Sequence, residues 1–217
     1  MSKSEQLRQT VAQAIAEFEK NTAFAAVERG EFTRQDYQQL LLHLFYQTYE
    51  GPSSFALAGV NCALQNKAAS EYLLAHAEEE NLHYRWVIDD LKSVGYTGPS
   101  PVDLTPPPDT LAYVSFNFYI AQRQPLARFA IATVLEGIAA ELGAHYGQKM
   151  MACADLKPEN CTFFTSHSVL DVSHCDDLWK VIETFQLSDT EWAWMELAAQ
   201  TAGKLYAAIY NAAMQRP

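Results

Sequence analysis

The sequence predicts an all-α protein, and three observations carry this prediction. The chain has nine glycines and nine prolines in 217 residues, fewer than the roughly 12% that these two residues average together. Apolar residues recur at spacings of three and four, which is the period of a helix. No convincing pair of strands is present. The length of the chain predicts a single domain that spans residues 1–217. Its 49% of apolar residues are ample for a buried core.

The N-terminal third is expected to form helices that begin and end at recognisable residues. Thr33 and Asp36 are spaced as in a capping box, which predicts the start of a helix. Gly51 and Pro52 are expected to kink or break that helix near residue 50, and helix resumes over about 53–64. An earlier helix over about 5–20 has one apolar face, formed by Leu7, Val11, Ile15 and Phe18.

The remaining helices are bounded by glycine, proline and capping residues. Gly95 closes one long helix, and five prolines within residues 98–109 predict a rigid, extended connection. Ser188 and Glu191 are spaced as a second capping box, which opens the last helix. We expect these helices at about 67–94, 110–123, 126–153, 166–185 and 188–214.

Charge and hydropathy disfavour several classes of function. The net charge of −11 argues against nucleic-acid binding, which depends on Lys and Arg, and against an anionic membrane surface. The longest apolar run, around 125–140, is interrupted by Arg128 and Glu136 and is too short to span a membrane. The N-terminus lacks the apolar segment of a signal peptide, so we expect a cytoplasmic protein.

The cysteines give no sign of a disulfide framework or a zinc ribbon. They are scattered and form no CxxC pair. We expect them to be buried, inert thiols. The four are Cys62, Cys153, Cys161 and Cys175.

The sharpest motif is the segment from His167 to His174, which contains Asp171. The three polar residues lie at positions i, i+4 and i+7, so a helix places them on one stripe. Two imidazoles and a carboxylate on one face can bind a transition metal, and the alternative is a solvated polar stripe. We interpret the segment as a metal-binding motif.

A second group lies in the run of three acids that ends at Glu80. Glu80 and His83 have the Glu-x-x-His spacing that recurs in carboxylate-bridged di-iron bundles. Glu79 is one turn from His83 and is an alternative ligand to Glu80. Three consecutive acids cannot all face one way, so an exposed charge run is the competing interpretation.

A third acid, Glu136, lies in an almost entirely apolar segment. Burying it without a partner is costly, so a metal or an arginine is expected beside it. Arg128 lies two turns earlier on roughly the same face. It could bind a substrate carboxylate, pair with Glu136 or extend to solvent.

Together these helices offer three imidazoles and three carboxylates. Three carboxylates against two Fe²⁺ ions leave a net charge of +1, which is a plausible balance. Oxygen and nitrogen ligands with open positions suit iron or manganese. The six residues are Glu80, His83, Glu136, His167, Asp171 and His174.

This order of ligands resembles the heme-oxygenase-like di-iron oxidases, relatives of the thiaminase-II and pyrroloquinoline-quinone-synthase folds. The resemblance covers about residues 37–210. It rests on Glu…His, a Glu roughly fifty residues later, and His-x3-Asp-x2-His roughly thirty further. The residues that follow His83, through Trp86, Asp90 and Gly95, and the Gly51-Pro52 pair also resemble this family.

The resemblance implies a heme-oxygenase-like bundle of about seven to eight helices around a central cavity. It implies two Fe(II) ions, with manganese as the alternative, and O2 as co-substrate. The substrate would be a small organic molecule, carboxylate- or amine-bearing. One iron would take Glu80, His83 and Glu136, and the other would share Glu136 and take His167, Asp171 and His174.

Two further residues are candidates for contact with substrate. Arg128 could hold a carboxylate, and Tyr46 could lie near the iron. We expect His43 and His76 at the surface or as capping residues. Because the first histidine is His43, no proximal heme ligand is present near the N-terminus, which argues against heme.

Two other functions stay open from the sequence. A metal-free enzyme on the same fold, of the thiaminase or cofactorless-oxidase kind, would need a nucleophilic cysteine in the thiaminase case. A non-catalytic interaction protein would use the acidic surface and would have no need of the six-residue set. An external electron donor and a homodimer are also open.

Overall fold

The computed structural model describes residues 1–215, except for the side chains of Val169, Leu170 and Val172. Across the described residues the chain is helical and has no strand, which confirms the all-α prediction. The α-helices are α1 (Lys3–Phe18), α2 (Thr22–Glu28), α3 (Arg34–Cys62), α4 (Lys67–Glu80), α5 (Tyr84–Ser93), α6 (Pro108–Arg123), α7 (Arg128–Ile138), α8 (Ala144–Ala154), α9 (Thr162–Ile182) and α10 (Asp189–Ala213).

Side-chain caps start several helices where the sequence predicts them. The capping boxes at Thr33 and Ser188 are both formed and open α3 and α10. The predicted apolar face of α1 is buried throughout. Helix α2 was not predicted, because seven residues are too few to show a period. It starts at Asn21, whose side chain accepts a hydrogen bond from the Phe24 amide.

Of the two outcomes expected at Gly51-Pro52, a kink or a break, helix α3 contradicts the break. It runs unbroken for 29 residues with Pro52 inside it. Proline removes one backbone hydrogen bond. A long helix that packs against α4, α5, α6 and α10 tolerates that loss. Ser54 donates a hydrogen bond to the carbonyl of Gly51 at 2.8 Å, which occupies an acceptor in this turn.

The expected single helix over 67–94 is wrong in the opposite sense, because it divides into α4 and α5. Between them the backbone bonds span three residues rather than four, from Asn81 to Glu78 and from His83 to Glu80. This tighter turn changes the direction in which successive side chains project. The change affects the two residues that matter most, since Glu80 ends α4 and His83 precedes α5.

The predicted helix over 126–153 is also divided. A 3₁₀ turn (Pro125–Ala127) precedes α7, and a π-helical turn, η3 (Ala139–Gly143), separates α7 from α8. At Gly143 an added Cβ would lie 3.2 Å from the Cβ of Ser168, and at Gly137 one would lie 2.6 Å from Ile15. The glycines therefore let α9 and α1 approach this segment closely.

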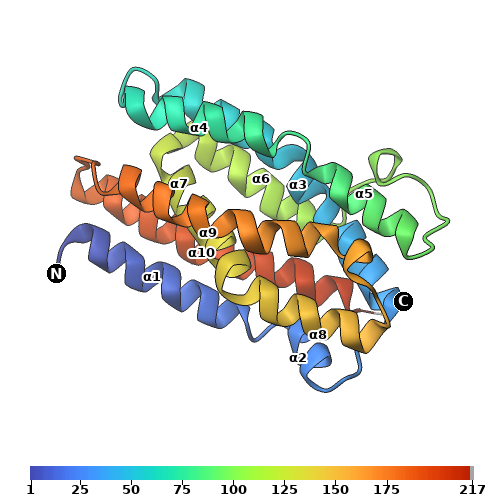
Figure 1. Ribbon diagram of the computed structural model, residues 1–217. Helices are drawn as coiled ribbons and strands as arrows, with labels where there is room; N and C mark the ends of the chain where they lie inside the picture. The colour runs from blue at the N-terminus through green and yellow to red at the C-terminus, as the bar shows by residue number, and fades with distance from the viewer. Residues whose placement is uncertain (216–217) are drawn as a thin grey trace.

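Figure 1 shows α9 passing between α4 on one side and α1 with α8 on the other. Helix α3 packs against α4 and α6, α1 packs against α10, and α7 lies between α9 and α10. The connection between α5 and α6 contains a short 3₁₀ turn, Pro101–Asp103, and a further 3₁₀ turn, Pro158–Asn160, precedes α9. This arrangement brings α4, α7 and α9 together around the interior.

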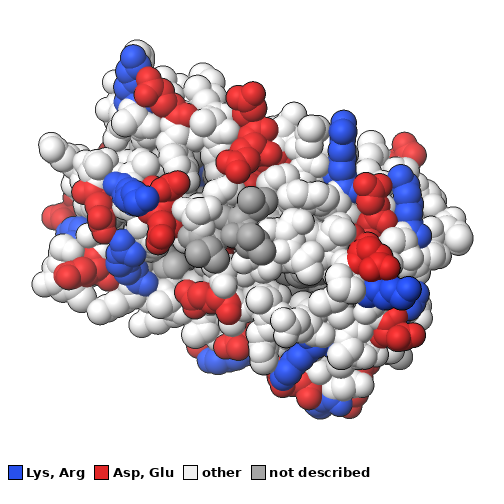
Figure 2. Space-filling view, in the orientation of Figure 1, with Lys and Arg blue, Asp and Glu red and all other residues white. Residues whose placement is uncertain are grey.

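Acidic and basic side chains are interspersed on the face of the molecule that Figure 2 shows. In Figure 2, Lys and Arg lie singly or beside Asp and Glu, and the described part of this face has no continuous basic patch. Among the described residues, no helix combines the length and the apolar character needed to cross a membrane.

Candidate metal centre

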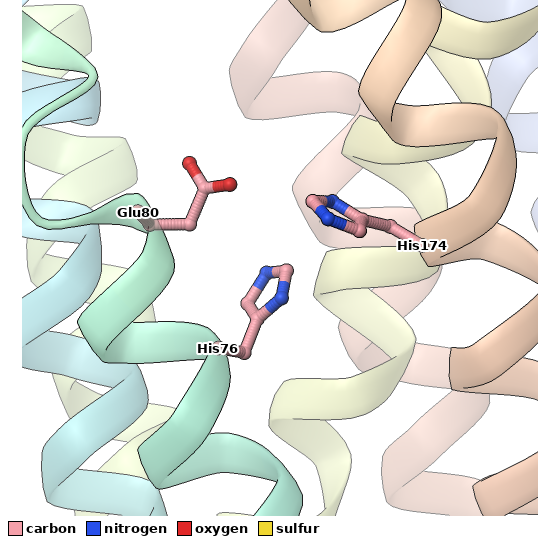
Figure 3. A group of neighbouring side chains, drawn as sticks. All are labelled: His76, Glu80 and His174. Carbon is pink, nitrogen blue, oxygen red and sulfur yellow. The ribbon is translucent and has the colours of Figure 1, made fainter.

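Two histidines and a glutamate converge from α4 and α9. His76 and Glu80 lie one turn apart on α4, and His174 faces them from α9 (Figure 3). One potential ligand atom from each residue lies within 4.8 Å of the others. Both histidines are at least nine-tenths buried, so the group is enclosed rather than a surface cluster.

A second group of the same kind shares Glu80. It adds His83 and His167, again with ligand atoms within 4.8 Å of one another. His83 Nδ1 lies 2.7 Å from Glu80 Oε2, and His167 Nε2 lies 3.9 Å from that oxygen. Glu80 therefore stands between two groups of imidazoles, as a carboxylate that bridges two metal ions would.

The orientation of His167 is set by its own helix. Its Nδ1 lies 2.8 Å from the carbonyl oxygen of Phe163, one turn earlier. A carbonyl only accepts, so Nδ1 carries the proton and donates it. This leaves Nε2 facing Glu80, where it can bind a metal once its proton is displaced.

Glu136 of α7 completes the interior of the cluster. Its Oε1 lies 3.0 Å from His76 Nε2, and its Oε2 lies 3.7 Å from His174 Nδ1. Neither Glu136 Oε2 nor His174 Nδ1 has a hydrogen-bond partner among the described atoms, although both are buried. Unfilled lone pairs on a buried carboxylate and a buried imidazole are what a metal ion would fill.

The charges in this cluster depend on one another. Burial opposes ionisation of Glu80, but the neighbouring imidazoles of His167 and His83 outweigh it and hold the pKa of Glu80 well below its usual range. The carboxylate of Asp171 is the main reason that the pKa of His174 rises to about 9. Burial raises the pKa of Glu136. Without metal, the cluster thus retains protons that a metal ion would displace.

Helix α9 is held at its start by Asp90 of α5. The two oxygens of Asp90 accept hydrogen bonds from the amides of Thr162 and Phe163, each at 2.9 Å, from the Thr162 hydroxyl and from Tyr37. The amides at a helix N-terminus need such acceptors. The N-cap residue of α9, Cys161, supplies none from its side chain. Asp90 therefore fixes the helix that carries His167, Asp171 and His174.

A cavity borders the cluster. Its lining includes His76, Glu80, Glu136, His167 and Asp171 on one side. Much of the remainder is apolar or aromatic, from α3, α6, α7 and α10. The residues of this second part include Pro52, Phe55, Tyr113, Ala132, Leu135, Tyr206 and Tyr210. A small organic molecule in this cavity would therefore lie beside the imidazole and carboxylate groups.

The structure thus gathers all six sequence-predicted ligands. Glu80 belongs to both groups of potential ligands and its side chain is 16% exposed. The Glu79 side chain is 50% exposed and contacts only His174 of the set, at 3.1 Å. The geometry favours Glu80 over Glu79 as the central carboxylate.

The expectation for His76 is wrong. It is 5% exposed and lies within the cluster rather than at the surface or at a helix cap. One signal in the sequence could have identified it, since His76 and Glu80 are at i and i+4 on the same helix. His43 is half-buried and does not line the cavity.

Tyr46 also lies apart from the cluster. Its hydroxyl donates to the carbonyls of Pro101 and Leu104, in the proline-rich connection. It lines a second, separate hollow with His43 rather than the central cavity. The proline-rich segment folds back onto α3 here, which could not be inferred from local sequence, and the suggested role of Tyr46 near iron has no geometric support.

Comparisons with known proteins agree with this fold. A family model described as iron-containing redox enzyme matches residues 38–203. A comparison with curated protein sequences finds no match. The chain belongs to this family of iron-containing redox enzymes, since the match covers most of its length.

Solved structures with the same fold include three informative neighbours. A domain of unknown function with a heme oxygenase-like fold from Shewanella denitrificans OS217 has a TM-score of 0.88 at 18% identity, covering 96% of this chain and 90% of that one. A TenA homologue from P. horikoshii OT3 has a TM-score of 0.79 at 15% identity, covering 98% of both chains. The heme oxygenase from Leptospira interrogans has a TM-score of 0.75 at 16% identity, covering 98% of this chain and all of that one.

At these identities the neighbours establish the fold, which is heme-oxygenase-like as the sequence predicts. The family match supports a redox enzyme.

Proposed function

We propose that this protein is a non-heme di-iron, O2-dependent oxidase or oxygenase that acts on a small organic substrate in the central cavity. The observation that carries the proposal is the pair of three-residue groups that share Glu80. Each group offers two imidazoles together with the shared Glu80 carboxylate. Such a set of donors suits iron or manganese. Glu136 and Asp171 add two carboxylates within the same enclosure.

The donor set fits two ions better than one. His83 and His167 lie on one side of Glu80, while His76 and His174 lie on the other. The ring centroids within each pair are 5.1 Å apart, so each pair can converge on one ion. Most of the charge of two divalent ions would be balanced by three carboxylates, those of Glu80, Glu136 and Asp171. Few charged groups near the ions would then lack a group of opposite charge.

When bound, iron would supply the activation of O2, which protein side chains alone do not provide. The residues of this chain fix the ligand geometry and shape the cavity. Asp90 holds the start of α9, and the Phe163 carbonyl orients His167. The apolar wall excludes water from the substrate beside the cluster. The electrons for O2 reduction would come from the substrate or an external donor.

The thiaminase-like alternative meets an obstacle in the cysteines. No cysteine is among the described residues that line the cavity. Burial raises the pKa of the Cys161 thiol to about 11 and that of Cys175 to about 12. A nucleophilic cysteine requires a lowered pKa, which neither of these thiols has. Cys62 and Cys161 are buried as expected, whereas Cys153 and Cys175 are only half-buried.

The test is an anaerobic titration of the metal-free protein with Fe²⁺, followed by admission of O2 and stopped-flow absorbance. We expect two equivalents of iron to bind and a transient visible band to form. His167→Ala and Glu136→Ala should each abolish the band. Arg123→Gln is the matched control, because this exposed residue ends α6 outside the cavity.

Two results would count against the proposal. Binding of no iron, with no reaction with O2, would favour a metal-free enzyme or an interaction protein. Tight binding of heme with a Soret band, in place of two ferrous ions, would favour heme chemistry on this fold.

A further inference from the structure

A second polar feature of the cavity, apart from the carboxylates and imidazoles, is the guanidinium of Arg128. Arg128 starts α7, is only 2% exposed and lines the cavity. Its Nε donates to the Ser54 hydroxyl at 3.1 Å, and its Cζ lies 3.7 Å from the centroid of the Phe55 ring. These contacts hold the guanidinium in place, and the low exposure rules out extension to solvent.

Among the described residues, the charge of Arg128 has no counter-ion in direct contact. No carboxylate of the described residues lies within 4.0 Å of the guanidinium, and its Nη1 is buried without a hydrogen-bond partner. The expected alternative of a pair with Glu136 is therefore not formed, since Glu136 lies two turns further along α7 and contacts His76. An unpaired buried cation is costly, and proteins keep one where a ligand supplies the anion.

Two more unpartnered atoms lie on the same wall, from α6. The Tyr113 hydroxyl and Asn117 Oδ1 are both buried and have no hydrogen-bond partner in the described part of the chain, and both residues line the cavity. Burial raises the pKa of Tyr113 to about 12, and the nearby charge of Arg128 opposes this rise. The hydroxyl thus stays protonated at neutral pH and can donate. Three unsatisfied polar atoms on an otherwise apolar wall indicate a built binding site.

We propose that Arg128, Tyr113 and Asn117 form a carboxylate-binding subsite that holds the substrate's acid group. Arg128 Nη1 and the Tyr113 hydroxyl would each donate to a carboxylate oxygen. Asn117 Oδ1 would accept from a donor next to the carboxylate, such as an amino or hydroxyl group. A carboxylate fits better than a phosphate, because a single guanidinium balances a monoanion and the same cavity is lined by three acids, Glu80, Glu136 and Asp171.

The position of the subsite limits the size of the acid. The Phe55 ring lies 3.7 Å from the Arg128 guanidinium and has its centroid 4.5 Å from that of His76. A single aromatic side chain thus connects the subsite and the metal-ligand cluster. The acid would present a carbon a few bonds from its carboxylate to the irons. The existence of the subsite does not depend on the proposed function. The further statement that the bound acid is the molecule oxidised rests on it.

The test is calorimetric binding of butanoate to the metal-free protein, with butanamide, butylammonium and inorganic phosphate as comparison probes. Absence of metal prevents the carboxylate from binding to iron instead. We expect butanoate to bind and the other three to bind at least about tenfold more weakly, since hydrogen bonds to a charged group contribute about that factor.

Substitutions of Arg128 and Tyr113 test whether butanoate binds at the proposed subsite. Arg128→Gln should weaken butanoate at least about tenfold, and Tyr113→Phe should weaken it by a smaller factor. Arg123→Gln removes the same charge from an exposed position and should leave binding unchanged. Should Arg128→Gln fold poorly, Arg128→Lys keeps the charge and should give an intermediate affinity because it loses the planar fork.

The outcomes separate the subsite from the metal chemistry. Equal affinity for butanoate and phosphate, or butanoate affinity that Arg128→Gln leaves unchanged, would overturn the subsite. The Arg128→Gln variant should still bind two equivalents of Fe²⁺. If butanoate binds in an Arg128-dependent way and no iron binds, the subsite is retained and the di-iron proposal is removed. If iron binds and butanoate binding does not depend on Arg128, the di-iron proposal is retained and the subsite is removed.

Discussion

Two buried carboxylates, Asp90 and Glu136, lie next to α9 and have contrasting surroundings. Asp90 is fully buried, and its oxygens accept four hydrogen bonds from Tyr37, Thr162 and Phe163. Glu136 is 7% exposed, contacts His76 through one oxygen and has no hydrogen-bond partner for the other. Buried acids are costly in both cases.

The difference separates a structural acid from a proposed metal ligand. The lone pairs of Asp90 are used by the N-terminus of a helix, so nothing remains for a ligand. Those of Glu136 are directed toward imidazoles that are themselves incompletely paired. The same substitution, acid to amide, should therefore have opposite consequences at the two positions.

The largest effect is expected for metal binding in Glu136→Gln. Loss of the carboxylate should weaken the binding of at least one Fe²⁺ by about a hundredfold or more, since even residues that only orient ligands contribute about 10–100-fold. Because burial raises the pKa of Glu136, removal of its charge should leave the metal-free protein at least as stable as wild type. Iron titration and urea denaturation measure the two quantities. If Glu136→Gln is destabilised and its iron affinity is unchanged, Glu136 is a structural acid rather than a metal ligand.

Asp90→Asn should instead lower the free energy of unfolding by about 2–4 kcal/mol, because an amide NH2 group replaces an acceptor that faces backbone amides. Urea denaturation of the metal-free protein measures it. The control is Asp89→Asn, whose side chain is 70% exposed and lies 3.5 Å from Lys92. Such an exposed pair is worth at most about 1 kcal/mol. Equal losses for both variants would remove the special role of Asp90.

A smaller effect is expected for His76, which contacts Glu136 and belongs to one of the two groups of ligands. His76→Phe preserves an aromatic ring between Phe55 and Tyr72 while removing the nitrogen atoms. One of the two iron equivalents should bind about 10–100-fold more weakly. His43→Phe, outside the cavity, should bind both equivalents as wild type does. Two unchanged affinities in His76→Phe would exclude His76 from the centre.

The smallest effect is a pH dependence. Asp171 chiefly raises the pKa of His174 to about 9, above the ordinary histidine pKa of 6.5. A raised histidine pKa stabilises the metal-free fold fully below pH 6.5, and this contribution is lost as pH rises through about 9. Metal binding requires the neutral imidazole, so Fe²⁺ affinity should rise over the same window, by at most about tenfold per pH unit for one proton. Anaerobic titrations at pH 6.5, 7.5 and 8.5 measure this slope. A flat or falling affinity would contradict the protonated state of His174.

Much of the fold and part of the site could be predicted from local sequence. Spacing alone placed His167, Asp171 and His174 on one stripe, because these residues lie on a single helix. The break between Glu80 and His83 was missed, since i to i+3 hydrogen bonds leave no pattern in the sequence. His76 and Tyr113 were missed for a different reason. Each gains its role from residues distant in the chain, Glu136 and Arg128, whose proximity is set by the packing of α4, α6 and α7.

The most direct test of the central claim is iron-edge anomalous diffraction from crystals loaded with Fe²⁺ under anaerobic conditions. The account predicts two anomalous peaks, one beside His83 and His167 and the other beside His76 and His174, with Glu80 between them. Iron at a different place, or full iron loading with a single peak at this cluster, would contradict a di-iron centre.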